Sequence, residues 1–386
     1  MDLTAAFNSR FNRPPALIAR APGRVNLLGE HVDYNGGPVL PAAIDRAVTI
    51  AAAPTTDEIV HLYALDLQEE ATFALYRLEG KAGLDGDPLP RWALYPAGVA
   101  WALRRAGLAV QGLEAVYTSD VPIGAGLSSS AAVEVAFAVA WQALGAWDVD
   151  RMALARLCQQ AENQYVGVNC GLMDQFASAH GVAGHALYFD TRSLEWEALP
   201  LPTETAIAIA DSGVRRSLAS SAYNERRAAC EQAVELLRRY LPGIQTLRDV
   251  SPVEYAAFSG YLPEVVRRRA EHVVREIDRV HSAVRALRQG RRQAFGAYMF
   301  SGHASLRDLY EVSTPELDAL VAIAHDLPGC IGARLTGAGF GGCTVNLVQE
   351  DKAPEFIRGL ETGYLEKTGR QAQVYLCRAS DGARVD

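Results

Sequence analysis

The stretch Asp120–Ala136, DVPIGAGLSSSAAVEVA, joins a glycine–serine turn directly to a run rich in alanine and valine. Glycines in the turn allow the backbone to adopt conformations closed to other residues and to approach an anion closely. The serines occupy the place of a helix N-cap, and the first helical amides would meet negative charge with the positive end of the helix dipole behind them. We therefore predict a phosphate-binding loop, with the candidate residues Pro122, Gly124, Gly126, Leu127, Ser128, Ser129 and Ser130.

Two familiar nucleotide-binding motifs do not describe this loop. No Gly-Lys-Ser/Thr follows it, so it is not a Walker A sequence, and Ser129 stands where a dinucleotide fingerprint has its third glycine. The alternative is a surface turn that caps an ordinary core helix. A strand expected at Ala115–Ser119 precedes the turn, and the order of strand, glycine-rich turn and helix favours a phosphate site.

Length and composition indicate two domains. The chain has 386 residues, of which 49% are hydrophobic, so it is too long for one typical core and apolar enough to fill two. Gly181 and Gly184 interrupt a helical run before a strand expected at Ala186–Asp190. We expect one domain at residues 1–182 and a second at residues 183–386.

Charge and cysteine usage restrict the partners and the compartment. A formal net charge of −8 argues against nucleic acid and favours a small ligand. The six cysteines are scattered without a CxxC pair, which is typical of reduced thiols. The N-terminus has no apolar core of a signal peptide, and the longest apolar segment, Ala131–Trp147, is too short for a bilayer. We expect a cytoplasmic protein without a membrane partner, present as a monomer or a weak homodimer.

A polar run near the N-terminus suggests a ligand rich in hydroxyl groups. GRVNLLGEHVDYNGGPVLP at Gly23–Pro41 places Arg24, Glu30, His31 and Asp33 among glycines and prolines. The run is too polar for a core strand. Carboxylates and imidazoles bind sugar hydroxyls well, because each buried polar group must find a partner. A solvated acidic loop is the alternative.

A second candidate carboxylate lies in CGLMDQ, Cys170–Gln175. Asp174 falls in the first turn of a helix expected at Leu172–Ala179, beside Met173 and Phe176. A carboxylate in such a partly apolar setting needs a partner, and a nearby cation would keep it ionised. We expect Arg24 to be that cation, although a structural salt bridge would have the same sequence pattern.

The second half contains a long helix and a glycine-rich segment. In the helix expected at Glu264–Gln289, arginines alternate with acidic residues such as Glu276, which we interpret as a solvated face. RLTGAGFGGCTVNLV at Arg334–Val348 predicts either a glycine hairpin or a wall that closes a cleft from the second half.

Three segments together resemble the ordered motifs of the GHMP small-molecule kinases. They are GRVNLLGEHVDYNGGPVLP, VPIGAGLSSSAAVEVA and LTGAGFGGCTVNL. The first segment and CGLMDQ are similar to the galactose-phosphorylating branch of that family. The likeness continues through Ser212–Cys230 and covers nearly the whole chain. Val32 and Pro38 depart from the usual threonine and the usual aromatic or aliphatic residue.

This resemblance implies a role for individual residues. Asp174 would accept or orient the proton of the sugar C1 hydroxyl. Arg24 would hold the Asp174 carboxylate anionic and would offset charge on the transferred phosphoryl group. Mg²⁺ would be met by Ser130 and Glu162, since a hard cation that bridges phosphates needs few protein ligands. Trp92 resembles the residue that packs on adenine, with a buried helix tryptophan as the alternative. The sugar would lie against Glu30, His31, Asp33, Gly171 and Tyr223.

The resemblance also implies the fold and the reaction. The fold would be α+β in two lobes, with a mixed sheet and helices N-terminally and an antiparallel sheet and helices C-terminally. The reaction would be ATP-dependent phosphorylation of D-galactose to α-D-galactose 1-phosphate, the first committed step of galactose catabolism in the Leloir pathway. An N-acetylgalactosamine kinase and a non-catalytic sensor of galactose and ATP are the alternatives. Intact Arg24, Asp174 and Ser130 argue against the sensor.

Overall fold

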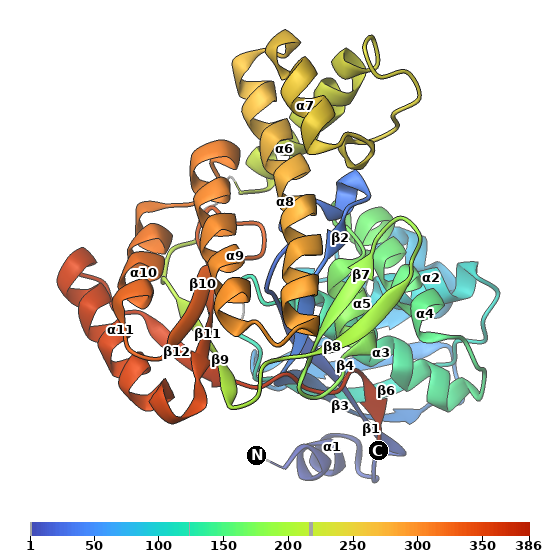
Figure 1. Ribbon diagram of the computed structural model, residues 1–386. Helices are drawn as coiled ribbons and strands as arrows, with labels where there is room; N and C mark the ends of the chain where they lie inside the picture. The colour runs from blue at the N-terminus through green and yellow to red at the C-terminus, as the bar shows by residue number, and fades with distance from the viewer. Residues whose placement is uncertain (1, 123, 216–218) are drawn as a thin grey trace.

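The structure, a computed structural model, describes residues 2–122, 124–215 and 219–386. Ile123 of the glycine–serine loop and residues 216–218 of the segment Ser212–Cys230 lie outside the described part. Figure 1 shows two regions that each combine a sheet with helices, and a helical projection above them. The predicted α+β class is confirmed.

A mixed sheet of six strands forms the first region. Its order is β13-β1-β3-β6-β4-β5, and all neighbours are antiparallel except β4 and β6, which are parallel. The strands are β1 (Leu17–Asn26), β3 (Pro41–Pro54), β4 (Ile59–Ala64), β5 (Glu69–Ala74), β6 (Leu113–Ser119) and β13 (Arg384–Val385).

Helices cover both faces of this sheet. Phe7 of α1 packs on one face with Ala51 and Val116, while Ile50 and Ala52 face the core on the other side. Because β3 is buried on both faces, its sequence is a nearly continuous apolar run rather than an alternating one. The helices are α1 (Leu3–Phe11), α2 (Leu94–Arg105), α3 (Ser129–Gly145), α4 (Arg151–Gln160) and α5 (Met173–His180).

Helix α3 lies at the centre of the first region. Its alanines allow close approach to β1 and β3, and Phe137 and Trp141 fill the space toward neighbouring helices. Eight of its apolar side chains and Glu134 are buried. Because α3 is buried this fully, it has little freedom to shift. The N-terminus of α3 therefore holds the end of the preceding loop in a fixed position.

The second region is built on an antiparallel sheet of four strands in the order β10-β11-β9-β12. Alternate residues of β9 face opposite layers: Ile207 and Ile209 face α9, whereas Ala208 faces α10 and α11. The elements are β9 (Thr205–Asp211), β10 (Cys330–Thr336), β11 (Cys343–Gln349), β12 (Gln373–Cys377), α9 (Arg292–Ser305), α10 (Pro315–Asp326) and α11 (Ala353–Thr368).

A small sheet and a helical projection complete the molecule. The sheet, of order β2-β7-β8, contains β2 (Pro38–Val39), β7 (His185–Asp190) and β8 (Trp196–Pro200). The projection contains α6 (Ala219–Leu237), α7 (Pro252–Phe258) and the start of α8 (Glu264–Arg288), which then runs down between the two regions (Figure 1). Within the described residues, no helix combines the length and apolarity needed to cross a membrane.

Two expectations about polar residues are wrong. Residues 23–26 are not excluded from the sheet: they form the buried end of β1, where Asn26 N–H donates to the Thr336 hydroxyl at 2.9 Å. The charged side of α8 is not wholly solvated, because Glu276 is fully buried and pairs with Arg334 at 2.8 Å. In both places partners from distant segments satisfy polar groups that the local sequence leaves unpaired.

The chain crosses between the regions at its C-terminal end. β13 pairs with β1 through Ala19 and Val385, so the last residues of the chain belong to the first sheet. We propose a main division near residues 182 and 183, with β13 returning across it.

Candidate active site

A pocket of about 800 Å³ lies where the two regions meet. The N-terminal polar run, the segment around Asp174, the start of α6 and the glycine-rich segment after β10 all contribute to it. Its lining residues include Arg24, Glu30, His31, Asp33, Tyr34, Arg91, Leu94, Glu162, Cys170, Gly171, Met173, Asp174, Tyr223, Gly337 and Ala338. Both interpretations of the glycine-rich segment hold: it joins the antiparallel strands β10 and β11 as a hairpin, and its Gly337 and Ala338 form part of the pocket wall.

Backbone contacts hold the three motif segments together. The Arg24 N–H donates to the carbonyl oxygen of Leu127 at 3.1 Å. Gly337, at a φ of +84°, lies so close to Gly126 that an added Cβ would be 3.0 Å from the Gly126 oxygen. Only glycine combines this close approach with a positive φ. Segments more than 200 residues apart therefore pack as one unit beside the pocket.

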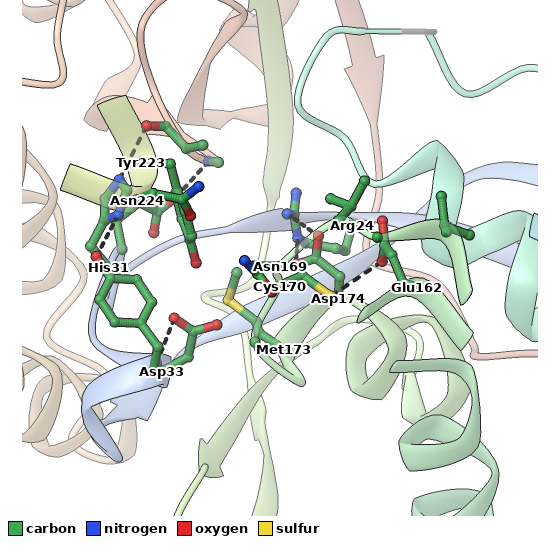
Figure 2. A pocket seen from close by; sticks show the side chains of 18 of the residues that line it. Arg24, His31, Asp33, Glu162, Asn169, Cys170, Met173, Asp174, Tyr223 and Asn224 are labelled. Atoms are coloured by element: carbon green, nitrogen blue, oxygen red, sulfur yellow. Dashed lines mark hydrogen bonds and ion pairs between the residues drawn. The ribbon is translucent and has the colours of Figure 1, made fainter. Parts of the chain in front are cut away.

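Arg24 and Asp174 form the ion pair that the sequence predicts. The guanidinium Nε donates to Asp174 Oδ1 at 2.8 Å and Nη2 donates to Oδ2 at 2.7 Å, in a two-pronged arrangement (Figure 2). Arg24 Nη1 donates to the Gly126 oxygen at 2.7 Å, which fixes the third direction of the fork. The Arg24 side chain is 5% exposed and that of Asp174 is 25% exposed, so the carboxylate is the partner open to the pocket. Bidentate pairs of this kind are strong and directional.

The glycine–serine loop adjoins the pocket through the bond from Ser128 to Asp174, although none of its described residues is among those that line the cavity. Ser128 precedes α3 with a φ of +57°, and its hydroxyl donates to Asp174 Oδ2 rather than capping the helix. The expected side-chain cap is therefore absent at Ser128, because a tertiary acceptor competes for the hydroxyl. Gly124 and Gly126 are exposed, whereas the Leu127 side chain is buried and offers only its backbone. Pro122, Ser129 and Ser130 are partly exposed.

Glu162 lies at the rim beside Asp174, in an irregular turn, Ala161–Val166, that continues α4. Burial raises the pKa of Glu162, and the nearby Asp174 adds to this shift, while the hydroxyl of Ser130 favours the charged form. The hydroxyl oxygen of Ser130 at the start of α3 and the carboxylate of Glu162 just after α4 thus lie beside each other. This donor set suits a hard divalent cation bound mainly by phosphate and water.

A buried amide fixes Glu162 from behind. Gln175 Nε2 donates to Glu162 Oε2 at 2.7 Å and to Glu134 Oε2 at 3.0 Å. Glu134 is fully buried one helical turn beyond Ser130, and burial raises its pKa well above the usual range. Glu134 and Gln175 were not predicted as site residues from the sequence, although Gln175 directly follows Asp174.

Asp33 lies across the pocket from Glu162 in Figure 2, and Gly171 packs against it. Gly171 approaches the Asp33 carboxylate so closely that any Cβ would overlap it. Burial, with the nearby charge of Asp174, raises the pKa of Asp33 to about 6. The Tyr34 N–H, which donates to Asp33 Oδ1 at 2.9 Å, opposes this shift. Among the residues that the structure describes, Asp33 forms no ion pair, so its carboxylate retains capacity for a ligand hydroxyl.

The carboxylate of Glu30 is already hydrogen-bonded within the protein, unlike a side chain that is free to bind a sugar. It is 2% exposed, accepts from the Gly337 N–H at 2.7 Å, and also accepts from the Asn26 amide. Burial raises its pKa to about 8, while Arg334, 3.9 Å away, favours the charged form. Arg334 itself is fully buried. Gly337 and Arg334 could not be predicted as partners of Glu30, because both belong to a segment about 300 residues away in the chain.

The ring of His31 is also engaged within the protein. Its Nδ1 lies 2.9 Å from the Tyr34 hydroxyl and its Nε2 lies 3.1 Å from the Ala338 oxygen. The Tyr223 ring lies 5.6 Å from it, centroid to centroid, and lines the pocket as expected. Burial, with help from His272, lowers the pKa of His31 to about 3.

Trp92 is placed apart from the other predicted residues. It precedes α2, its indole N–H donates to Glu69 at 2.6 Å, and its ring packs 5.9 Å from that of Tyr117. Its neighbours Arg91 and Leu94 line the pocket, but Trp92 is not among the lining residues. Arg91 and Leu94 were not predicted, because neither residue belongs to a motif that points to a ligand.

The comparisons define first the class of protein. The model for the GHMP kinases N terminal domain matches residues 95–182, and the model for the GHMP kinases C terminal matches residues 283–365. Mevalonate kinase from Methanococcus jannaschii shares the fold, with a TM-score of 0.67 at 20% identity over 94% of this chain and 98% of that one. Fold and motifs together are those of a GHMP kinase.

Closer relatives narrow the class. The galactokinase galactose-binding signature matches residues 5–54. The chain is 48% identical to a galactokinase of Roseiflexus sp. (strain RS-1), over 99% of this chain and 96% of that protein, and 44% identical to human galactokinase, over 98% and 95%. Lactococcus lactis galactokinase, crystallised with galactose, superposes with a TM-score of 0.93 at 35% identity over 99% and 98% of the two chains. The chain belongs to the galactokinase family.

Proposed function

We propose that this protein transfers the terminal phosphoryl group of ATP to the C1 hydroxyl of D-galactose, giving α-D-galactose 1-phosphate and ADP. This is the first committed step of galactose catabolism in the Leloir pathway. Membership of the galactokinase family supports the reaction. The observation that carries the assignment of the site is the Arg24–Asp174 pair, since it holds a carboxylate in a fixed orientation at a pocket that has room for a sugar.

Asp174 is the group proposed to act on the C1 hydroxyl. Among the described residues, its Oδ2 accepts from Arg24 and Ser128, whereas Oδ1 accepts from Arg24 alone. A carboxylate oxygen has two lone pairs, so Oδ1 keeps one for the incoming hydroxyl. Arg24 orients the carboxylate through both of its oxygens, and its positive charge would also stabilise negative charge that develops on the transferred group.

The sugar ring is proposed to lie between Asp174 and Asp33. Asp33 would accept from the C3 and C4 hydroxyls, and Gly171 leaves the space this requires. Tyr223 would cover the ring. Glu30 and His31 border the same space, but most of their hydrogen-bonding capacity is already used inside the protein.

The nucleotide and its metal are proposed to lie on the other side of Asp174. The exposed backbone of Gly124 and Gly126 and the start of α3 would hold the phosphates, with the adenine toward α2. Ser130 and Glu162 would hold Mg²⁺, which neutralises phosphate charge when it is bound. Trp92, next to the pocket-lining Arg91, is the proposed contact of the adenine.

A coupled assay of ADP release over a panel of sugars tests this function. We expect turnover with galactose, and kcat/KM for glucose lower by about tenfold to a few hundredfold, because the equatorial C4 hydroxyl of glucose leaves Asp33 without the partner that the axial hydroxyl of galactose supplies. A preference for N-acetylgalactosamine would identify the kinase of that sugar instead. Binding of galactose and ATP without any ADP release would identify a sensor.

A further inference from the structure

Helix α5, which carries Asp174, contacts β1, which carries Arg24, at a second point one helical turn further on. The Ser178 hydroxyl donates to the carbonyl oxygen of Pro22 at 2.7 Å, and Ser178 is only 1% exposed. Residues four apart on a helix lie on the same face, so Asp174 and Ser178 both face β1. Two contacts therefore join these elements, one from Asp174 to Arg24 and one from Ser178 to Pro22.

The Pro22 carbonyl lies at an irregularity of the first sheet. The register between β1 and β3 shifts between Pro22 and Arg24. Proline has no N–H to donate, and the N–H of Ala47, which lies opposite Pro22, donates to the Asp120 carboxylate. A hydroxyl from α5 thus supplies a donor to the Pro22 oxygen at a place where the regular pairing of strands is interrupted. Such irregularities redirect the side chains that follow them, here that of Arg24.

The end of β1 is also fixed by the glycine–serine loop. An added Cβ on Gly23 would lie 2.7 Å from the Leu127 oxygen, and the Arg24 N–H donates to that same oxygen. Arg24 Nη1 donates to the Gly126 oxygen at 2.7 Å. Because the loop holds Arg24 in place, Arg24 could not follow a displacement of α5. Such a displacement would lengthen the bonds from Arg24 to Asp174.

The C-terminal segment of the chain holds the other end of α5. The N–H of Ala383 donates to the Ser178 oxygen at 2.9 Å, and the N–H of Gly382 donates to the Gly181 oxygen at 2.8 Å. The last carbonyls of a helix have no partner within the helix, so these main-chain donors satisfy two of them. The segment then pairs with β1 as β13 (Figure 1). One segment is thus bonded to both α5 and β1.

We propose that Ser178 is a positioning residue for the catalytic pair. Its bond to Pro22 sets the place of α5 along β1 and so keeps Asp174 at the distance from Arg24 at which both carboxylate oxygens are bound. Ser178 is not among the described residues that line the pocket, so it acts through Asp174. This inference rests on the proposed function, because the position of Asp174 affects the rate only if its carboxylate acts on the acceptor hydroxyl.

The variant Ser178→Ala tests this role through kinetics. It leaves the buried Pro22 oxygen without the hydroxyl donor. We expect kcat to fall about tenfold, because a small misplacement of a reacting group lowers the rate strongly. KM for galactose and KM for ATP should change less than about twofold, since the residues proposed to bind them keep their places. An unchanged kcat, or a rise in KM for galactose as large as the fall in kcat, would contradict the proposal.

The matched control is Ser380→Ala. The Ser380 hydroxyl donates to the Ile44 oxygen at the same distance of 2.7 Å, also between segments distant in the chain. The main-chain bonds of Gly382 and Ala383 to α5 do not use this hydroxyl. We expect both variants to lower the melting temperature, whereas kcat, measured well below either melting temperature, should fall only in Ser178→Ala. An equal fall of kcat in both variants would show a general loss of stability and would overturn the proposal.

The position of the pair can be read without turnover by NMR on protein labelled with ¹⁵N at arginine, with Arg24 assigned by comparison with Arg24→Lys. The Arg24 Nε hydrogen bonds to Asp174 and the Arg24 side chain is 5% exposed, so this hydrogen should exchange slowly with water. We expect exchange about tenfold faster in Ser178→Ala and unchanged in Ser380→Ala. The same exchange rate in Ser178→Ala as in wild type would refute the role of Ser178. Faster exchange in a protein that does not phosphorylate galactose would contradict the proposed function while supporting the placement of α5 by Ser178.

Discussion

The two sides of the pocket treat their carboxylates differently. On one side Asp174 has a cation of its own, because Arg24 binds both of its oxygens. On the other side Asp33 has no ion-pair partner among the described residues, and burial raises its pKa to about 6. A carboxylate that must act on a proton is kept ionised before the substrate arrives, whereas one that binds hydroxyls gains its partners with the substrate. We call these the catalytic side and the sugar side.

The largest expected effect comes from removing the charge on the catalytic side. Asp174→Asn keeps the shape of the side chain but loses the proton acceptor, so we expect kcat to fall about 10²–10⁴-fold or more. Galactose and ATP should still bind, as measured by calorimetry. Asp150→Asn, at the start of α4, is the control for a carboxylate outside the pocket. Near-normal turnover in Asp174→Asn would refute the catalytic assignment.

A smaller effect is expected on the sugar side. Asp33→Ala removes the group proposed to read the C4 hydroxyl, so kcat/KM for galactose should fall about tenfold to a few hundredfold. The ratio of galactose to glucose should narrow while KM for ATP stays close to its starting value. Steady-state titrations of both sugars with both proteins measure this. If the ratio does not change, the contact that selects the axial hydroxyl lies elsewhere, with Glu30 and Tyr223 as the next candidates.

The proposed metal site should respond without disturbing the sugar side. Glu162→Gln replaces a charged oxygen by a neutral one, and we expect the Mg²⁺ concentration for half-maximal rate to rise about tenfold or more. KM for galactose should change less. Glu235→Gln, on the exposed face of α6, is the control. A change confined to galactose affinity would assign Glu162 to another site.

The smallest effect concerns stability and its dependence on pH. The pKa of Asp33 is raised in the folded protein to about 6, so its contribution to stability is fully present below its unfolded value near 4 and is lost as the pH rises through 6. Asp33→Asn avoids the cost of ionisation. We expect the variant to be more stable than wild type at pH 8, by on the order of 1–2 kcal/mol, with the difference vanishing below about pH 4. Denaturant unfolding of both proteins at pH 8 and below about pH 4 checks this prediction. If the difference in free energy of unfolding is the same at both pH values, burial does not disfavour the ionised form of Asp33.

Much of the catalytic side was predictable because its residues carry local patterns. The glycine–serine loop, the start of α5 and the acidic position at Asp174 are each recognisable within a few residues. The partner Arg24 lies 150 residues away in the chain and was expected as the cation of the N-terminal polar run, and the structure supports that choice. The absence of a side-chain cap at Ser128 was not predictable. Ser128 lies where a helix cap is expected, but its hydroxyl donates to Asp174.

The support of the sugar side could not be read from the sequence. Glu276 and Arg334 are 58 residues apart, and helical periodicity assigns Glu276 to the charged face of α8. The hydrogen bonds that join Cys230, Tyr310, Tyr34, His31 and Ala338 in series likewise need four separate segments of the chain to meet in space. Local patterns report which groups need a partner, but not which distant segment supplies it.

Identification of the product tests the central claim most directly. Protein incubated with ATP, Mg²⁺ and galactose is analysed by ³¹P and ¹H NMR. We predict a single sugar phosphate, the α-anomer esterified at C1, formed in equal amount with ADP and absent from Asp174→Asn. A phosphate ester at any other hydroxyl, or release of ADP and inorganic phosphate without a sugar ester, would contradict the placement of the C1 hydroxyl at Asp174.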